Sequence, residues 1–268
     1  MIRAVFFDIG GVVVSSPLIA IHAYEKTLSL PPDYLNVQIV SRGEGGAWQQ
    51  FERGELPIFE FYELFGRELS DTKKGNEWYS QHLRKKGVDP ETVELPKSLA
   101  INGRELFGMM MRGAQYDRYI IEAIGHIRAS KKFLTIALTN NFIEPYNSIL
   151  ATPPSATFTP QEELAFLGWT EGAVPKALRD LFDDFIDSSQ VGMRKPEPEF
   201  FLYACKKHNL KPEEVVMLDD LGINLKAART LGMKTILVPI GETKQAVLDL
   251  QNILDISLLS AVDTTSKL

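Results

Sequence analysis

The sequence predicts an α/β fold: a doubly wound, Rossmann-like parallel sheet with a helical cap inserted between its first and second strands. Apolar runs with the length of buried strands alternate with amphipathic helical segments over residues 116–254. This alternation is typical of a parallel sheet covered on both faces. A similar apolar run over residues 3–14 precedes a strand-poor stretch with helical spacing. We therefore predict a core domain of residues 1–16 and 113–268 and a helical cap domain of residues 17–112.

The first predicted strand ends in a carboxylate. Its apolar, aromatic and β-branched residues lead to Asp8, and Gly10 and Gly11 follow. Such a run is typical of a buried parallel strand, which would deliver Asp8 to the C-terminal edge of the sheet, where α/β proteins bind ligands. Without side chains at Gly10 and Gly11, the backbone can turn sharply and approach a ligand closely.

The stretch from 17 to 112 has apolar residues at helical spacing. We predict one helix from Leu18 to Leu28, another opened by Pro31-Pro32, and a polar helix from Asn76 to Lys86. The aromatic residues that supply apolar faces to this region are Trp48, Phe51, Phe59, Tyr62 and Phe65.

The core elements then alternate along the chain. The predicted strands are 133–138, 185–186, 215–218 and 235–238, and the predicted helices are 120–128, 198–210, 221–231 and 242–254. Two segments are expected to lack regular structure: 151–160, which is rich in proline and hydroxyl residues, and the polar tail 260–268.

Composition restricts the partners. The formal net charge of -6 argues against a general nucleic-acid binder, which usually carries a basic face. No run reaches the roughly 18 to 20 apolar residues of a membrane span, and the N-terminus has no secretory pattern. The single cysteine, Cys205, excludes an intrachain disulfide and fits a reducing compartment. We expect a cytoplasmic protein without a nucleic-acid or membrane partner. The apolar surface of the cap is compatible with a homodimer.

Polar groups follow four predicted strands in turn. Because the C-terminal ends of parallel strands share one edge of the sheet, these groups can surround one site. Carboxylates are hard oxygen ligands for Mg²⁺, and a threonine hydroxyl, a backbone amide and a lysine can hold phosphoryl oxygens. The groups are Asp8 after the first strand, Thr139 and Asn140 after the second, Arg194 and Lys195 in the loop after the third, and Asp219 and Asp220 after the fourth, with Asn224 one turn further.

These four motifs resemble those of the haloacid dehalogenase-like superfamily, which includes phosphatases that act through a phosphoaspartate. Phe-Phe-Asp8-Ile-Gly-Gly stands at the first motif, Leu138-Thr139-Asn140 at the second, Lys195 in the third and Leu218-Asp219-Asp220 at the fourth. The match covers residues 3–16 and 116–240. Within the superfamily, the third and fourth motifs look most like the N-terminal phosphatase domain of soluble epoxide hydrolases.

The resemblance implies a Mg²⁺-dependent hydrolase of a small organic phosphate. Asp8 would be the nucleophile, Thr139 and Asn140 would hold the phosphoryl group, and Lys195 would neutralise charge. Mg²⁺ would be held by Asp8, the carbonyl group of Gly10 and Asp219, with Asp220 or Asn224 acting through water. The candidate substrate-binding residues are Gly10, Gly11, Trp48, Phe51 and Arg194. For Trp48 and Phe51, packing within the helical core is the alternative.

One position departs from the family pattern. The family usually has a second aspartate two residues after the nucleophile, as general acid and base, and this chain has Gly10 there. Three consequences remain open: a substrate with a good leaving group, such as a diphosphate or anomeric phosphate; another proton donor, for which Glu44, Glu52 and Glu55 are candidates; or decayed catalysis.

The glycine at position 10 also leaves two alternatives to a phosphatase open. A 2-haloacid dehalogenase-type hydrolase also lacks the second aspartate, although the retained pair Asp219-Asp220 is what a Mg²⁺ site requires. A catalytically decayed protein could keep the pocket for binding a metal or a phosphate.

Overall fold

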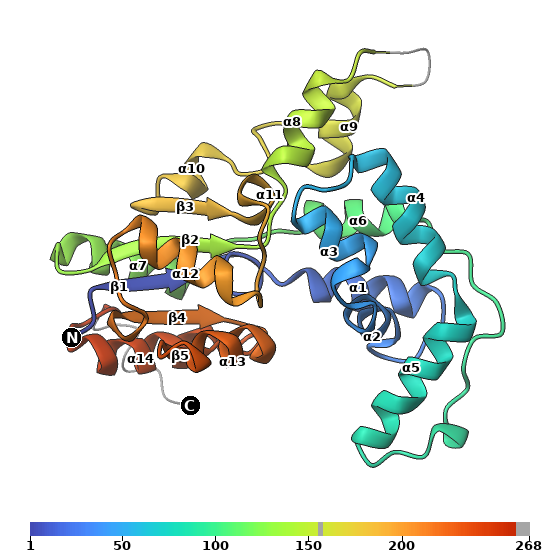
Figure 1. Cartoon of the computed structure of the whole chain (residues 1–268), viewed down its shortest axis with the longest axis horizontal. Coiled ribbons are helices and arrows are strands. Elements are labelled where there is room, and N and C mark those ends of the chain that lie inside the picture. Colours follow the sequence, from blue (N-terminus) through green and yellow to red (C-terminus); the bar gives the residue numbers. More distant parts are fainter. Residues whose placement is uncertain (155–157, 261–268) are drawn as a thin grey trace. The chain divides into compact units, whose positions relative to one another are not determined.

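The computed structural model describes residues 1–154 and 158–260 (Figure 1). Its α/β part is built on a five-stranded parallel sheet with the strand order β3-β2-β1-β4-β5. The strands are β1 (Ala4–Phe7), β2 (Leu134–Thr139), β3 (Asp184–Asp187), β4 (Val215–Asp219) and β5 (Lys234–Leu237). The predicted parallel sheet is therefore confirmed. Since β1 is the central strand, the residue that follows it emerges between β2 and β4.

Each face of the sheet packs against helices, because side chains alternate between faces along a strand. Val5 and Phe7 belong to the apolar cluster covered by α7 (Arg118–Ser130) and α14 (Thr243–Leu254). Ala4 and Phe6 belong to the cluster covered by α12 (Pro198–Lys207) and α13 (Gly222–Thr230). All four strand residues are fully buried. The sheet is thus wound on both sides, as the sequence predicts.

Two short helices of this part were not predicted from the sequence. They are α10 (Lys176–Arg179) and α11 (Ser188–Val191). The second begins directly after β3, because the Asp187 carboxylate accepts hydrogen bonds from the backbone N–H groups of Ser189 and Gln190. This N-cap brings the chain around toward the loop that carries Lys195.

The chain forms two compact units. The α/β unit contains Met1–Ser16, Ala114–Ile143 and the described residues from Glu171 on, and the helical unit contains Pro17–Gly113 and Glu144–Thr170. The sequence-based assignment of 113–268 to the core does not match this division over 144–170, which packs with the helices. These helices are α1 (Pro17–Thr27), α2 (Tyr34–Ser41), α3 (Ala47–Glu52), α4 (Ile58–Leu69), α5 (Thr72–Lys85), α6 (Gly103–Arg112), α8 (Ile143–Ala151, with Ile143 in the α/β unit) and α9 (Pro160–Leu167).

Aromatic side chains form the interior of the helical unit. The ring of Phe51 stacks on that of Phe61, with centroids 3.9 Å apart, and meets Phe107 edge to face. Trp48 packs against Phe65 with a centroid separation of 5.6 Å. Such pairs contribute about 0.5–1.5 kcal/mol each beyond area burial. Of the residues predicted to supply apolar faces, Phe51, Tyr62 and Phe65 are therefore part of the core, whereas Phe59 is 38% exposed.

A buried carboxylate, that of Glu163, attaches α9 to the other helices. The Glu163 carboxylate accepts hydrogen bonds from the Tyr62 hydroxyl (2.7 Å) and from the Arg104 guanidinium (2.9 Å). The Arg104 guanidinium carbon lies 3.5 Å from the ring centroid of Phe166, which also packs on Gly108 of α6. Neither α8 nor α9 was predicted from the sequence, because their apolar patterns are short and a proline- and hydroxyl-rich segment lies between them.

The segments predicted to be irregular are partly within the described residues. Residues 152–154 and 159 have no helix or strand, whereas Ala151 ends α8 and Pro160 begins α9. Residues 155–157 and 261–268, which these predictions also covered, lie outside the described residues. Among the described residues, no helix is both long and apolar enough to cross a membrane.

Candidate active site

Three sheet strands end beside one another at the predicted position. The backbone N–H of Asp8 donates to the Leu218 carbonyl group of β4 (2.9 Å), which extends the β1–β4 ladder by one residue. On the other side of β1, Phe7 is in register with Ala137, two residues before Thr139. The ends of β1, β2 and β4 therefore bring Asp8, Thr139 and Asp219 to the same edge of the sheet.

Lys195 connects two of these strand ends. Its Nζ lies 2.8 Å from Asp8 Oδ1 and 2.7 Å from Asp219 Oδ2, and its side chain is fully buried. Asp8 Oδ1 also accepts the backbone N–H of Ile9 at 2.7 Å. Asp8 Oδ2 receives no hydrogen bond from the described residues. One oxygen of Asp8 is therefore fixed, and the other is available for chemistry.

Asp219 is held by several donors. Besides Lys195, the Asn224 side-chain amide donates to both of its carboxylate oxygens (3.0 and 3.2 Å), and the backbone N–H of Leu221 donates to Oδ1 (2.9 Å). The sequence-based role of Asn224 was to act on a metal through water. In the structure, Asn224 contacts Asp219 directly and fixes its orientation.

Burial opposes ionisation in this cluster. Burial raises the pKa of Asp8 well above its ordinary value, and the charges of Asp219 and Asp220 act in the same direction, whereas Lys195 lowers it. Burial, followed by the charge of Asp219, raises the pKa of Asp220 to about 6. For Lys195, burial alone would lower the pKa, but the Asp219 and Asp8 charges outweigh it and raise the pKa. Three carboxylates facing one lysine leave an excess of negative charge that a cation would stabilise.

The acidic residues also lie close enough to share a cation. Asp8, Asp219 and Asp220 each offer a carboxylate oxygen, and these oxygens lie within 4.8 Å of one another. Hard oxygen donors are the ligands that Mg²⁺ takes in proteins. The donor set therefore fits this ion.

The residues after β2 contact the Lys195 segment. Asn140 Oδ1 accepts the backbone N–H of Lys195 (2.8 Å), and Asn140 Nδ2 donates to the Lys195 carbonyl group (3.0 Å). The Asn140 side chain therefore positions Lys195, whereas the predicted phosphoryl contact involves the Asn140 backbone amide. Thr139 is 2% exposed, and its hydroxyl donates to the Asn140 carbonyl group at 3.3 Å.

Several predicted site residues have other surroundings. Phe51 is fully buried in the aromatic interior of the helical unit, so its prediction as a substrate-binding residue does not match its packing; Trp48 is half-buried in the same cluster. Arg194 is half-buried, and its backbone N–H donates to Glu197 Oε2 (3.1 Å). Among the proposed replacement acids, Glu55 forms an ion pair with Arg53, with its Oε1 2.6 Å from Arg53 Nε.

The sequence reasoning missed Ser16, Asp187 and Ser188. Ser16 Oγ donates to Asp220 Oδ2 (3.1 Å), and Ser188 Oγ accepts the backbone N–H of Asn141 (3.0 Å). Asp187 could have been found because it ends a strand, as Asp8 and Asp219 do. Ser16 had no signal in the sequence, since a serine after a turn is common.

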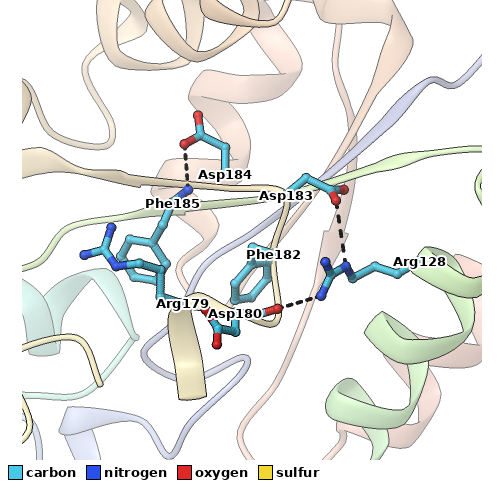
Figure 2. Close-up of a pocket in the computed structure, with 7 residues that line it drawn as sticks. All are labelled: Arg128, Arg179, Asp180, Phe182, Asp183, Asp184 and Phe185. Carbon is cyan, nitrogen blue, oxygen red and sulfur yellow. Dashed lines mark hydrogen bonds and ion pairs between the residues drawn. The ribbon is translucent and has the colours of Figure 1, made fainter. Parts of the chain in front are cut away.

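Figure 2 shows a hollow of about 420 Å³ elsewhere in the α/β unit. It lies at the start of β3, and therefore at the opposite end of the strand from Asp187. Arg128 extends into it from α7, donates to the Asp180 carbonyl group (2.6 Å) and lies 3.7 Å from the Asp183 carboxylate. We assign no ligand to this hollow.

The doubly wound sheet and the carboxylate–lysine cluster at its C-terminal edge define a Rossmann-like enzyme. A family model described as haloacid dehalogenase-like hydrolase matches residues 2–232, and the chain belongs to this family. The resemblance read from the four motifs is therefore confirmed.

Curated relatives include larger proteins. The chain is 30% identical over 263 residues to acyl-CoA dehydrogenase family member 10 of Mus musculus and 27% identical over 255 residues to bifunctional epoxide hydrolase 2 of Rattus norvegicus. These alignments cover 98% and 94% of the chain but 20% and 39% of the relatives, so the chain spans less than half the length of either. A glyceraldehyde 3-phosphate phosphatase of Pyrococcus furiosus is 40% identical over 81 residues, which are 28% of the chain and 33% of that protein.

A solved structure has the same fold. A predicted HAD-like family hydrolase from Porphyromonas gingivalis aligns with 96% of this chain and 100% of its own, with a TM-score of 0.52 and 19% identity. At this identity, the similarity shows the fold.

Proposed function

We propose that the protein is a Mg²⁺-dependent hydrolase of a small organic phosphate or diphosphate that acts through a phosphoaspartate on Asp8. The observation that carries the proposal is the hydrogen bonding of the two carboxylate oxygens of Asp8. Oδ1 is fixed by Lys195 and the Ile9 backbone, while Oδ2 receives no hydrogen bond from the described residues. A relative named glyceraldehyde 3-phosphate phosphatase supports phosphoryl chemistry.

Each residue of the site has a separate role in the proposed reaction. Asp8 Oδ2 attacks phosphorus, so that an O–P bond to Asp8 forms while the bond to the leaving group breaks; water then hydrolyses the acyl phosphate and releases phosphate. Thr139 and the backbone amide of Asn140 hold phosphoryl oxygens, and Lys195 offsets the charge of Asp8 and of the phosphate. Asp8, the Gly10 carbonyl group, Asp219 and Asp220 would hold Mg²⁺, which when bound orients the phosphoryl group and neutralises its charge.

Gly10 determines the kind of substrate in this proposal. A positioned general acid is typically worth about 10²- to 10⁴-fold in rate, and the usual family position for it holds glycine. A leaving group that is stable as an anion does not need protonation. We therefore infer a preference for diphosphates, anomeric phosphates or aryl phosphates over alkyl monophosphates.

The test is phosphate release, with and without Mg²⁺, from aryl phosphates, sugar 1-phosphates, prenyl and nucleoside diphosphates, and alkyl monophosphates. We expect metal-dependent turnover that Asp8→Asn abolishes, with the good leaving groups preferred. Gly10→Asp restores the acid, and the φ angle of Gly10 lies outside the left-handed region, so the variant should gain about 10²-fold or more on alkyl monophosphates alone.

Two results would contradict the proposal. Halide release from 2-haloacids without phosphate release would assign the protein to dehalogenation. Folded protein that binds Mg²⁺ and phosphate without turnover of any compound would indicate a binding function.

A further inference from the structure

Two adjacent serines at the end of the segment after β1 have different partners. Ser15 contacts backbone: its hydroxyl donates to the Gln115 carbonyl group (3.3 Å) and accepts the Gln115 N–H (3.1 Å). Ser16 contacts a member of the acidic cluster: its hydroxyl donates to Asp220 Oδ2 at 3.1 Å. Ser16 is 4% exposed. Ser15 therefore joins two connecting segments, whereas Ser16 acts on the carboxylate of Asp220.

The turn after β1 also leaves room for the Asp220 carboxylate, because Gly11 has no Cβ atom. A Cβ atom at Gly11 would lie 2.0 Å from Asp220 Oδ2 and 2.4 Å from its Cγ. Gly11 also has a φ of +80°, a conformation that L side chains rarely adopt. The Asp220 carboxylate thus lies against the Cα of Gly11 on one side and is hydrogen-bonded by Ser16.

The two neighbouring aspartates are oriented from different parts of the fold. Asp219 is held by Lys195, by Asn224 and by the Leu221 backbone, all from segments after β3. Asp220 is held by Ser16, which follows β1 and lies 204 positions away along the chain. The orientation of Asp220 consequently depends on the turn that also carries Asp8 and Gly10.

We propose that Ser16 is a positioning residue for the metal site: by holding Asp220 Oδ2, it presents the other carboxylate oxygen of Asp220 to Mg²⁺. The inference rests on the proposed function, because it requires that the acidic cluster binds the ion. Partners that orient metal ligands through hydrogen bonds typically contribute about 10- to 100-fold to metal affinity. Ser16 therefore contributes to metal affinity without contacting the ion.

The test is direct titration of the purified protein with Mn²⁺ as a spectroscopic substitute for Mg²⁺, followed by electron paramagnetic resonance, with no substrate present. We expect Ser16→Ala to weaken Mn²⁺ binding about tenfold or more, while the matched control Ser15→Ala binds as the wild type does. Thermal unfolding in EDTA confirms that each variant is folded.

A double-variant measurement separates positioning from general damage. If Ser16 acts through Asp220, adding Ser16→Ala to Asp220→Asn causes no further loss of Mn²⁺ affinity. Equal binding by wild type and Ser16→Ala, or an additive loss in the double variant, would overturn the inference while leaving the metal site in place. Absence of Mn²⁺ and Mg²⁺ binding by the wild type would instead overturn the proposed function, and this inference with it.

Discussion

Replacement of Lys195 by methionine should strongly destabilise the metal-free protein. Lys195 is fully buried, with its Nζ 2.8 Å from Asp8 and 2.7 Å from Asp219. Methionine preserves much of the apolar side-chain volume but removes the charge. Breaking a buried ion pair from one side typically costs about 3–5 kcal/mol, because the partner charge remains buried without compensation. Since two carboxylates lose their cation, we expect the free energy of unfolding to fall by at least about 3 kcal/mol.

The assay is urea denaturation in EDTA at pH 7, with Lys207→Met as the matched control. Lys207 also forms an ion pair at 2.7 Å, with Asp184, but its side chain is 43% exposed. Exposed pairs contribute about 0–1 kcal/mol, so the free energy of unfolding of Lys207→Met should fall by less than about 1 kcal/mol. Equal losses in the two variants, or a loss below about 1 kcal/mol in Lys195→Met, would refute the reasoning about buried charge.

The pH dependence of Lys195→Met provides a second readout. Burial already raises the pKa of Asp8, and removal of the lysine removes a group that lowers it. A carboxyl group whose pKa is raised in the folded state costs no stability below its unfolded pKa, and the cost accumulates as the pH rises from the unfolded pKa to the folded pKa. The deficit of Lys195→Met should therefore shrink as the pH falls toward the unfolded pKa of aspartate, about 3.9, and a deficit that grows would contradict this explanation.

Two further predictions concern packing and a second buried carboxylate. Gly103→Ala should destabilise the helical unit by about 1–3 kcal/mol or more, because its Cβ would lie 2.2 Å from the Tyr62 carbonyl oxygen. Gly125→Ala in α7 should stabilise by about 0.5–1 kcal/mol, because its Cβ would meet nothing within 4 Å beyond the backbone of its own helix. Urea denaturation that reverses this order would contradict the packing. Burial raises the pKa of Asp187 to about 6, so the wild type loses stability as the pH rises from about 4 to 6. Over that pH range, the stability of Asp187→Asn relative to the wild type should increase by up to about 3 kcal/mol. A constant difference between the urea midpoints of the two proteins would show that Asp187 does not titrate there.

The sequence was sufficient for the sheet and for the residues at its edge. The β-branched and aromatic run before Asp8, and the apolar run before Asp219, are local patterns that determine strand burial. Because parallel strands must end at one edge, the convergence of Asp8, Thr139 and Asp219 follows from strand positions alone. The family motifs then assign this edge to a hydrolase, which the family match confirms.

Contacts between distant segments required the tertiary structure. Tyr62 and Glu163 are 101 positions apart, and contacts such as their hydrogen bond show that 144–170 packs with the helical unit. Phe51 has the pattern of a helix-face residue whether it lines a pocket or fills a core, and its stacking on Phe61 decides for the core. Ser16 and Asp220 have no common sequence pattern, since one follows β1 and the other β4. Local periodicity determines which residues are buried, whereas the partner that a buried polar group finds depends on how the whole chain packs.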